Sequence, residues 1–230
     1  MFFPDKIKNI QPNYKVLEIG PGAHPFHRSD ILLELEYESE EEKIAQFGHN
    51  EKLITDKKIV YYKGEKFPFV DNEFDYVICS HVLEHVDNIP NFLNEIFRVS
   101  KMGYFEFPLI YYEFLYNINA HQNFLKFDTE KSLLYYMPKN SSNIDFFKPI
   151  QNFLLETLRL GHSKMITDMP EKFIQGFEWN TKFSSVETKD LNIFIHKNTK
   201  IPPPSNCPLP LTEASLSQLI KQLIKRVIHK

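Results

Sequence analysis

The amino-acid sequence predicts an α/β fold with a doubly wound, mostly parallel sheet. Over residues 1–108, short and nearly continuous apolar runs recur, as in strands that are buried on both faces of a sheet. Loops and segments of helical spacing separate these runs, which is typical of chains that alternate strands with helices. The chain has 230 residues, of which 42% are hydrophobic, so it can bury a core without disulfides. This length predicts one large domain, or one domain with an appendage.

Five apolar runs are expected to form the strands, at residues 15–19, 31–35, 58–62, 74–79 and 104–107. The acidic run 36–43 favours a helix after the second strand. Residues 90–100 carry apolar side chains at helical spacing, so a helix is expected there, with Gly103 as its stop. The fourth and fifth strands are therefore expected to be joined by a crossover helix.

Residues 109–172 interrupt this alternation and are predicted to form an insertion with many aromatic side chains. The aromatic residues concentrate near its beginning: Tyr111, Tyr112, Phe114, Tyr116, Phe124 and Phe127. Helical fragments are expected over residues 146–161. The insertion follows the carboxyl end of the fifth strand, and open α/β sheets bind ligands at that edge. Two interpretations stay open, a substrate cap and a local aromatic core.

Two further apolar segments, 173–179 and 191–197, are expected to close the sheet as a hairpin-like pair of strands. They complete a main domain over residues 1–200. A proline-rich linker over 201–211 and a basic amphipathic helix over 212–230 are expected to follow. That helix has three candidate roles: packing on its own domain, pairing with another copy, or peripheral contact with an anionic membrane surface.

Composition and charge limit the class of partner. The chain carries 27 Lys and Arg against 30 Asp and Glu, a net charge of −3, so a nucleic-acid partner is not expected. Cys79 and Cys207 lie in unlike settings and are expected to be reduced, unpaired thiols. Residues 1–10 lack the apolar core of a signal peptide, and no run reaches the about 20 apolar residues of a membrane span. We therefore expect a cytoplasmic protein, with peripheral contact at the inner face of the membrane as an added role for the terminal helix.

The strongest local motif is Gly20–Pro21–Gly22, which directly follows the first predicted strand and its acidic residue Glu18. Glycines at this point let the backbone turn sharply and approach a ligand closely. The third glycine of a dinucleotide-binding motif is missing, because His24, Pro25 and Phe26 stand there instead. Only 11 residues separate Gly22 from Glu34, too few for an ordinary crossover helix. The motif therefore argues against a nicotinamide or flavin dinucleotide.

An acidic residue, Glu34 or Glu36, ends the second predicted strand. A carboxylate in this place can accept hydrogen bonds from both hydroxyls of a ribose. The alternative is a solvated charge within the acidic run 34–42. Beside the glycine turn, the ribose interpretation is favoured.

A third motif covers residues 67–86, from a Phe-Pro-Phe segment through the fourth predicted strand to Ser-His-Val-Leu-Glu-His. In this order over residues 14–108, the three motifs resemble the class I S-adenosylmethionine-dependent methyltransferases of the methyltransferase type 11 kind. The segment 103–108 and the aromatic stretch around His121 are similar to a bacterial subgroup that is associated with surface-glycan assembly.

This resemblance implies a Rossmann-like fold with S-adenosylmethionine as cofactor and S-adenosylhomocysteine as product. It assigns residues by their place in the motifs: Glu18, Gly20, Pro21 and Gly22 to the methionine part, Glu34 to the ribose, and Ser80 and His81 to the amino-acid end beside the acceptor. The family usually has an aspartate for the adenine amine. Here Lys63 stands near that position, and Glu65 is the candidate substitute.

Methyl transfer depends largely on alignment of the reacting groups, although a hydroxyl or amine acceptor can also need a base. His81, His85 and His121 are the candidate bases, aided by Glu84 or Glu106. His81, Glu84 and His85 are spaced to share one face at the start of a helix, so His85 has the alternative role of holding that helix in place. The same triplet has ligand types for a divalent metal, but its spacing serves a helix cap equally well, and no resident metal is expected.

The predicted activity is O-methylation of a small-molecule or glycan hydroxyl in surface-polysaccharide biosynthesis. The main alternative is a degenerate, inactive protein of methyltransferase fold that acts in binding or scaffolding. A decarboxylase or an aminopropyl-transferring synthase on the same fold is a third class, and no residue in the chain favours it.

Overall fold

The computed structural model describes residues 1–37, 39, 41, 53, 55–64 and 66–195. The chain divides into two units, Met1–Ile195 and His196–Lys230, and the description below concerns the first. The predicted linker 201–211, the predicted helix 212–230, Cys207 and Glu65 lie outside the described residues.

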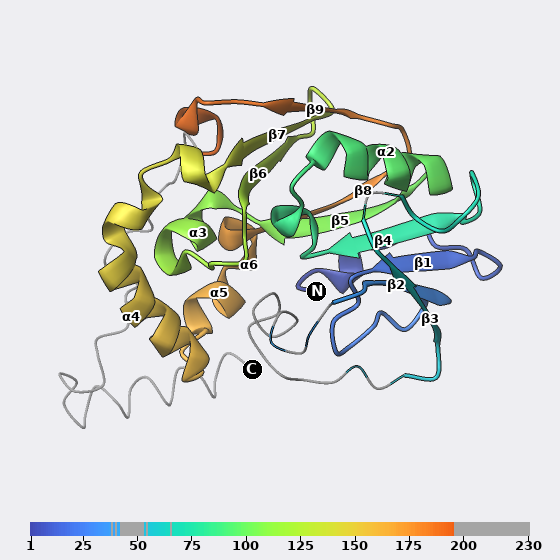
Figure 1. Ribbon diagram of the computed structural model, residues 1–230, viewed down its shortest axis with the longest axis horizontal. Coiled ribbons are helices and arrows are strands. Elements are labelled where there is room, and N and C mark those ends of the chain that lie inside the picture. The colour runs from blue at the N-terminus through green and yellow to red at the C-terminus, as the bar shows by residue number, and fades with distance from the viewer. Residues whose placement is uncertain (38, 40, 42–52, 54, 65, 196–230) are drawn as a thin grey trace, which may run out of the picture. The chain divides into compact units, whose positions relative to one another are not determined.

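The centre of the first unit is a six-stranded sheet in the order β3-β2-β1-β4-β5-β8 (Figure 1). Its strands are β1 (Val16–Ile19), β2 (Ile31–Leu35), β3 (Lys58–Tyr62), β4 (Tyr76–Ser80), β5 (Gly103–Pro108) and β8 (Ile174–Trp179). The first five are parallel to their neighbours, and β8 pairs antiparallel with β5 along one edge. This arrangement confirms the mostly parallel α/β sheet that the apolar runs predict.

One face of the sheet packs against helix α2 (Ile89–Val99). The helix begins at Asn88, whose side chain accepts a hydrogen bond from the amide of Asn91 at 3.0 Å, and Pro90 occupies its first turn. Its apolar stripe meets the inward side chains of β1, β4 and β5, including Leu17, Val77 and Phe105. The helix stops at Val99, so Gly103 is the first residue of β5 and not the helix stop that the sequence indicates.

The opposite face is covered by the chain that precedes β1, in place of the helix that a doubly wound sheet predicts there. Ile7, Ile10 and Tyr14 pack on a cluster that includes Tyr76 and Tyr104. The short helix η1 (Pro4–Lys6) belongs to this covering segment. Tyrosine suits this face because its ring packs in the core while its hydroxyl donates to a carboxylate, that of Glu178 for Tyr76 and that of Glu106 for Tyr104.

A second, three-stranded sheet has the order β6-β7-β9. Strands β6 (Asn123–Asp128) and β7 (Leu133–Pro138) form an antiparallel hairpin, and β9 (Ser184–Glu187) pairs parallel with β7. This sheet was not predicted. The expected hairpin-like pair is wrong, because β8 pairs with β5 and the described part of 191–197 contains the short helix η5 (Leu191–Ile193). Asp190 caps that helix by accepting a hydrogen bond from the amide of Asn192.

The region 109–172 contains helices in addition to the hairpin. They are α3 (Ile110–Tyr116), η3 (Lys139–Ser141), η4 (Ile144–Phe147), α4 (Lys148–Arg159), α5 (Lys164–Asp168) and α6 (Pro170–Phe173). Figure 1 shows α3, α4, α5 and α6 grouped together, with α3 directly after β5. No helix among the described residues is long and apolar enough to cross a membrane.

Candidate functional site

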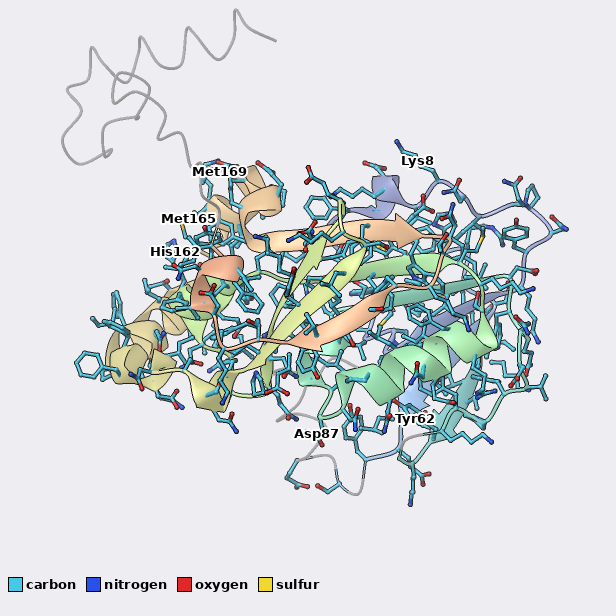
Figure 2. All side chains as sticks on the ribbon, turned by 90° about the horizontal axis from the view of Figure 1, so that it is seen from above. Lys8, Tyr62, Asp87, His162, Met165 and Met169 are labelled. Carbon is cyan, nitrogen blue, oxygen red and sulfur yellow. The ribbon has the colours of Figure 1, made fainter. Side chains whose placement is uncertain are left out.

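A cavity of about 1090 Å³ lies at the carboxyl ends of the parallel strands. Strands β1 and β4 are neighbours, while the chain leaves β1 toward β2 on the other side, so the cavity sits at the switch point of the sheet. It is lined by residues after β1, at the end of β2, after β4 and from the insertion: Gly20, Pro21, Gly22, Glu34, Ser80, His81, His85, Tyr112 and His121. Tyr62 and Asp87, which also line it, lie on the same side of the molecule in Figure 2.

The glycine turn forms one wall of the cavity. Gly20 has φ +59° and Gly22 has φ +61°, a left-handed conformation that residues with a Cβ seldom adopt. A Cβ on Gly20 would lie 2.5 Å from Val82 Cγ2, whereas a Cβ on Gly22 would meet no atom within 4 Å among the described residues. Gly20 is therefore required both for the turn and for close packing, and Gly22 leaves open space beside the cavity. Residues 20–30, all of them described, join β1 to β2 without a helix, as the short spacing predicts.

Glu18 holds the loop that follows this turn through hydrogen bonds. Its carboxylate accepts hydrogen bonds from the amide of Phe26 at 2.8 Å and from the hydroxyl of Ser29 at 2.6 Å. Burial raises the pKa of Glu18, although these two hydrogen bonds oppose that effect. Among the described residues that line the cavity, Glu18 is absent. The structure thus gives Glu18 a role in shaping the loop, whereas the sequence motif assigns it to the cofactor.

The end of β2 brings Glu34 to the cavity. Its side chain is buried, and one carboxylate oxygen accepts a hydrogen bond from the amide of Leu35 at 3.0 Å. Tyr37 and Tyr62 line the cavity beside it. These two tyrosines were not predicted from the sequence, although their positions after β2 and at the end of β3 could have indicated them.

Lys63, which stands near the adenine position of the family, is turned toward solvent. Its side chain is 69% exposed, and its Nζ lies 3.5 Å from a carboxylate oxygen of Glu36. Lys63 is not among the described residues that line the cavity. It therefore does not occupy the space where the sequence analysis placed the adenine.

His81 follows β4 and lies between two buried carboxylates. Its Nε2 is 3.2 Å from Glu106, and its Nδ1 is 3.3 Å from Glu84. Burial alone lowers the pKa of His81, but the two carboxylates outweigh burial and raise it to about 9. His81 is therefore an imidazolium at neutral pH and cannot accept a proton there, which counts against it as a base.

Glu106 collects hydrogen bonds from several parts of the chain. Ser80 donates from its hydroxyl at 3.1 Å, and Tyr104 donates from its hydroxyl at 2.7 Å. The backbone amides of Phe2 and Phe3 donate at 2.7 and 2.9 Å. Burial alone would raise the pKa of Glu106, but the interactions with His81 and these donors lower it to about 2. Glu106 is thus a fixed negative charge that joins β4, β5 and the segment before β1.

The expected helix start around Glu84 is a single 3-10 turn, η2 (Leu83–His85). His81 Nδ1 lies beside Glu84, whereas Nδ1 of His85 donates to the carbonyl of Ala120 at 2.9 Å. Two backbone-directed bonds tie the next segment to this turn: the amide of Gln122 donates to the carbonyl of Glu84, and the Gln122 side chain donates to the carbonyl of His85. His121 is thereby brought beside His85, with ring centroids 4.7 Å apart.

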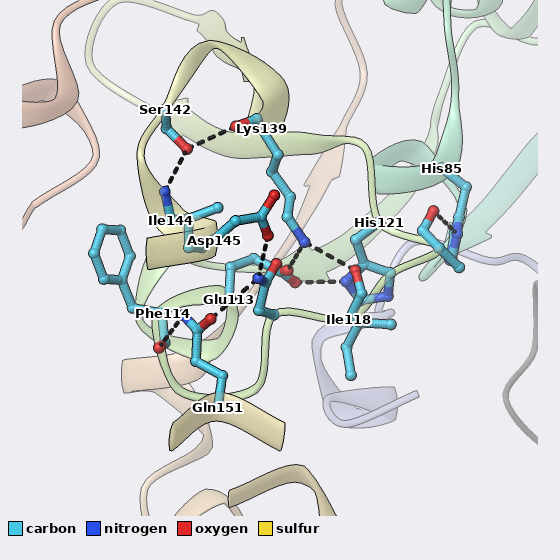
Figure 3. A network of polar contacts seen from close by, with 12 residues as sticks. His85, Glu113, Phe114, Ile118, His121, Lys139, Ser142, Ile144, Asp145 and Gln151 are labelled. Atoms are coloured by element: carbon cyan, nitrogen blue, oxygen red, sulfur yellow. Dashed lines mark hydrogen bonds and ion pairs between the residues drawn. The ribbon is translucent and has the colours of Figure 1, made fainter. Parts of the chain in front are cut away.

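His121 is held by a buried network within the insertion (Figure 3). Its Nδ1 and a carboxylate oxygen of Glu113 are 2.5 Å apart, and the second oxygen of Glu113 accepts from Lys139 Nζ at 2.8 Å. Lys139 also donates to the carbonyl of Ile118 at 2.8 Å. Glu113 and Lys139 were not predicted from the sequence, because they come from α3 and η3 and only the folded insertion places them around His121.

The imidazoles of His85 and His121 lie together at this end of the cavity. Burial lowers the pKa of His85, although the nearby carboxylate of Glu84 opposes that effect. Because Nδ1 of each ring is engaged with an acceptor oxygen, Nε2 is the nitrogen that keeps its lone pair. Of the three candidate bases, His85 and His121 therefore retain the chemistry that a base needs.

Comparison with known families finds a methyltransferase domain that matches residues 26–105. The match begins after the glycine turn and covers β2, β3, β4, α2 and part of β5. An uncharacterized protein of Methanocaldococcus jannaschii is 33% identical over 100 residues, which cover 43% of this chain and 45% of that protein. The chain thus matches less than half the length of this relative.

Solved structures give weaker likenesses. A SAM-dependent methyltransferase from Methanosarcina mazei is 19% identical with a TM-score of 0.32, over 53% of this chain and 69% of that one. The PH0226 protein from Pyrococcus horikoshii is 14% identical with a TM-score of 0.39, over 74% of this chain and 82% of that one. At these scores the likenesses add nothing on activity. The methyltransferase-domain match covers residues 26–105, about a third of the chain, and it falls on the mostly parallel α/β sheet whose strand ends border the cavity.

Proposed function

We propose that the protein transfers a methyl group from S-adenosylmethionine to the hydroxyl of a small molecule or glycan, in the biosynthesis of a surface polysaccharide. One observation carries this proposal: a single cavity joins the glycine turn and Glu34 at one end to His85 and His121 at the other. A cofactor site and a proton acceptor are thus parts of one space, as group transfer to a hydroxyl requires.

The residues present fit the cofactor. The open side of Gly22 admits a ligand against the backbone, and Glu34 offers a carboxylate at the place of ribose recognition. Tyr37 and Tyr62 supply aromatic surface for a flat base beside Glu34. The positive charge of His81 would attract the carboxylate at the amino-acid end. Glu18 would act indirectly by holding the turn, and the role proposed for Ser80 is contact with the same end.

When bound, the cofactor supplies an electrophilic methyl group on a sulfonium. The chain positions the acceptor oxygen, whose O–H proton passes to Nε2 of His85 or His121 as the O–CH₃ bond forms and the S–CH₃ bond breaks. Glu113 favours His121 for this role, because a buried carboxylate on Nδ1 stabilises the imidazolium that results. His85 has only a carbonyl oxygen on its Nδ1 and gains less from protonation.

The aromatic walls favour a sugar ring as the acceptor. Tyr112 lines the cavity and stacks near His121, with ring centroids 6.4 Å apart and an interplanar angle of 26°. Phe2 lines the same space. The likeness of 103–108 to the glycan-associated subgroup points the same way. Cytoplasmic location, and membrane contact or self-association through 212–230, stay part of this proposal.

The scaffold alternative is less favoured. Its main support is the lysine at the adenine position, but Lys63 points to Glu36 and leaves the cavity open. An inactive relative would also have little need for a buried carboxylate, Glu113, that holds an imidazole beside that cavity.

Calorimetric titration of the full chain with S-adenosylmethionine and S-adenosylhomocysteine tests the proposal. We expect micromolar binding of both, and loss of binding in Gly20→Arg, where the new side chain enters the space of Val82. Gly161→Arg is the matched control, since Gly161 also has positive φ, has nothing within 4 Å of its Cβ position, and does not line the cavity. Absence of binding by the natural chain, with folding verified by circular dichroism, would make the scaffold function the leading one.

A further inference from the structure

Three potential metal ligands meet at the acceptor end of the cavity. Glu84, His85 and His121 each offer one ligand atom, and these atoms lie within 4.8 Å of one another. They come from two separate segments, η2 and the chain before β6, which the hydrogen bonds of Gln122 hold together. This set differs from the triplet named in the sequence analysis: His121 takes the place of His81, which bridges Glu84 and Glu106.

The carboxylate of Glu84 is buried without a hydrogen-bond donor among the described residues. The residue is completely buried, and neither carboxylate oxygen has a hydrogen-bond partner among the residues that the structure describes. Its nearest charged neighbour is His81, which forms an ion pair with it at 3.3 Å but no hydrogen bond of ordinary geometry. The positive charge of His81 is shared with Glu106, and a buried carboxylate that accepts no hydrogen bond is costly, so Glu84 can still bind a further cation or a water molecule. The described residues supply no lysine or arginine partner for it.

The two histidines are oriented as metal ligands are. A metal-binding histidine usually donates its other ring N–H to a carboxylate or a backbone carbonyl, which fixes the tautomer. His85 donates from Nδ1 to the Ala120 carbonyl, and His121 is bound through Nδ1 to Glu113. In Figure 3 the second ring nitrogen of His121 points toward the side on which His85 lies. Lys139 donates a hydrogen bond to Glu113 and so holds in place the carboxylate that orients His121.

We propose that Glu84, His85 and His121 bind a divalent first-row cation of the Mn²⁺ to Zn²⁺ series at the acceptor end of the cavity. Two imidazoles and one carboxylate suit these ions better than Mg²⁺ or Ca²⁺, which prefer oxygen ligands throughout. Ligands of a tetrahedral ion with bonds of about 2.1 Å lie about 3.4 Å apart, so the ion would draw the three groups closer by side-chain rotation. Three protein ligands leave at least one position open, and both histidines line the cavity.

The open position would bind the acceptor oxygen, an extension that rests on the proposed methyltransferase function. A hydroxyl on the ion loses its proton more readily, because the positive charge stabilises the alkoxide. In the metal-bound protein His121 would be a ligand, so the proton of the acceptor hydroxyl would pass to solvent and not to His121. The acceptor class is then narrowed to hydroxyls that can reach a metal, such as vicinal diols of a sugar.

The test uses the full chain, freed of metal with a chelator and titrated with Co²⁺ while its visible absorption is recorded, and then with Zn²⁺ as competitor. We expect one equivalent to bind, with absorption bands in the visible that Zn²⁺ abolishes. His121→Ala and Glu84→Gln remove ligands and should weaken binding more than the about 10- to 100-fold that removal of an outer-shell partner costs. His162→Ala, at a histidine that lies outside the cavity, is the matched control and should bind as the natural chain does.

Folding of each variant is checked by thermal melting, and His85→Ala serves in place of Glu84→Gln where that buried substitution prevents folding. S-adenosylmethionine binding is measured on the same samples. Cofactor binding with no Co²⁺ binding, or with Co²⁺ binding unchanged in His121→Ala, overturns the metal site and leaves the proposed function standing. Co²⁺ binding with no cofactor binding supports the metal site and removes the proposed function.

Discussion

Different kinds of interaction shape the two ends of the cavity. At the end formed by β1 and β2, backbone conformation shapes the site: Gly20 and Gly22 turn the chain, and Glu18 holds the turn through hydrogen bonds to its loop. At the end formed by η2 and the insertion, buried charges shape it, and they come from distant parts of the chain. The cofactor end should therefore respond to changes of backbone conformation, and the acceptor end to changes of charge and pH.

The largest effect is expected at Glu113, on the acceptor end. Glu113→Gln leaves the buried ammonium of Lys139 without its carboxylate, and removal of one partner from a buried pair costs about 3 to 5 kcal/mol. Chemical denaturation should show this loss of unfolding free energy, and methyl transfer should fall with it. Lys139→Met in the same chain should restore part of the stability but not the turnover. Equal stability of Glu113→Gln and the exposed control Glu171→Gln would contradict the claim that buried charges hold the acceptor end together.

The next effect is a pH dependence at Glu106. The pKa of Glu106 is lowered from 4.5 to about 2 in the folded state. Its contribution to the free energy of unfolding is therefore fully present above about pH 4.5 and is lost as the pH falls through 2. The shift corresponds to about 3 kcal/mol over that window. Unfolding free energies measured between pH 6 and pH 2 should fall more steeply for the natural chain than for Glu106→Gln. Parallel curves for the two proteins would show that Glu106 is not the group responsible.

A smaller effect is expected at the glycine turn, where the two glycines can be compared directly. Gly22→Ala places a Cβ in open space at positive φ, which costs about 1 kcal/mol. Gly20→Ala has the same strain and an added clash with Val82, so it should cost more and weaken S-adenosylmethionine binding more. Val82→Ala should relieve the clash in the Gly20→Ala background. Thermal melting and calorimetry measure both quantities, and equal costs at the two glycines would contradict the close-packing role of Gly20.

The smallest effect is expected at Lys63. The residue is exposed and pairs only loosely with Glu36, and such surface pairs contribute about 0 to 1 kcal/mol. Lys63→Ala should therefore leave both stability and cofactor affinity within about a factor of three of the natural chain. A large gain in affinity on this substitution would mean that the lysine does reach the adenine, against its outward position.

The cofactor end could be predicted from the sequence because its signals are local. A strand, a glycine turn and an acid at the next strand end lie within 20 residues of one another, and parallel strands bring their carboxyl ends to one edge. The structure accordingly places Gly20, Pro21, Gly22 and Glu34 around one cavity. What the local pattern could not settle was the direction of Glu18, because a buried acid can face either a ligand or its own loop.

The acceptor end could be predicted only in part. The sequence named His81, His85 and His121, but the charge state of His81 depends on Glu106, which β5 brings beside it. Glu113 and Lys139 gave no signal, since nothing in their local sequence marks them as partners of His121. The second sheet could not be predicted for a similar reason: β7 pairs with β9 across about 50 residues of chain, and no local pattern in either strand marks the other as its partner.

The hydrogen bonds between the insertion and η2 have a consequence for how this protein can change over evolutionary time. Gln122 and Asn123 bind the backbone carbonyls of Glu84, His85 and Val86, not their side chains. A carbonyl is present whatever residue carries it, so this attachment survives substitution on the η2 side. Substitutions of the η2 side chains therefore leave these hydrogen bonds in place, whereas substitution of Gln122 or Asn123 removes them.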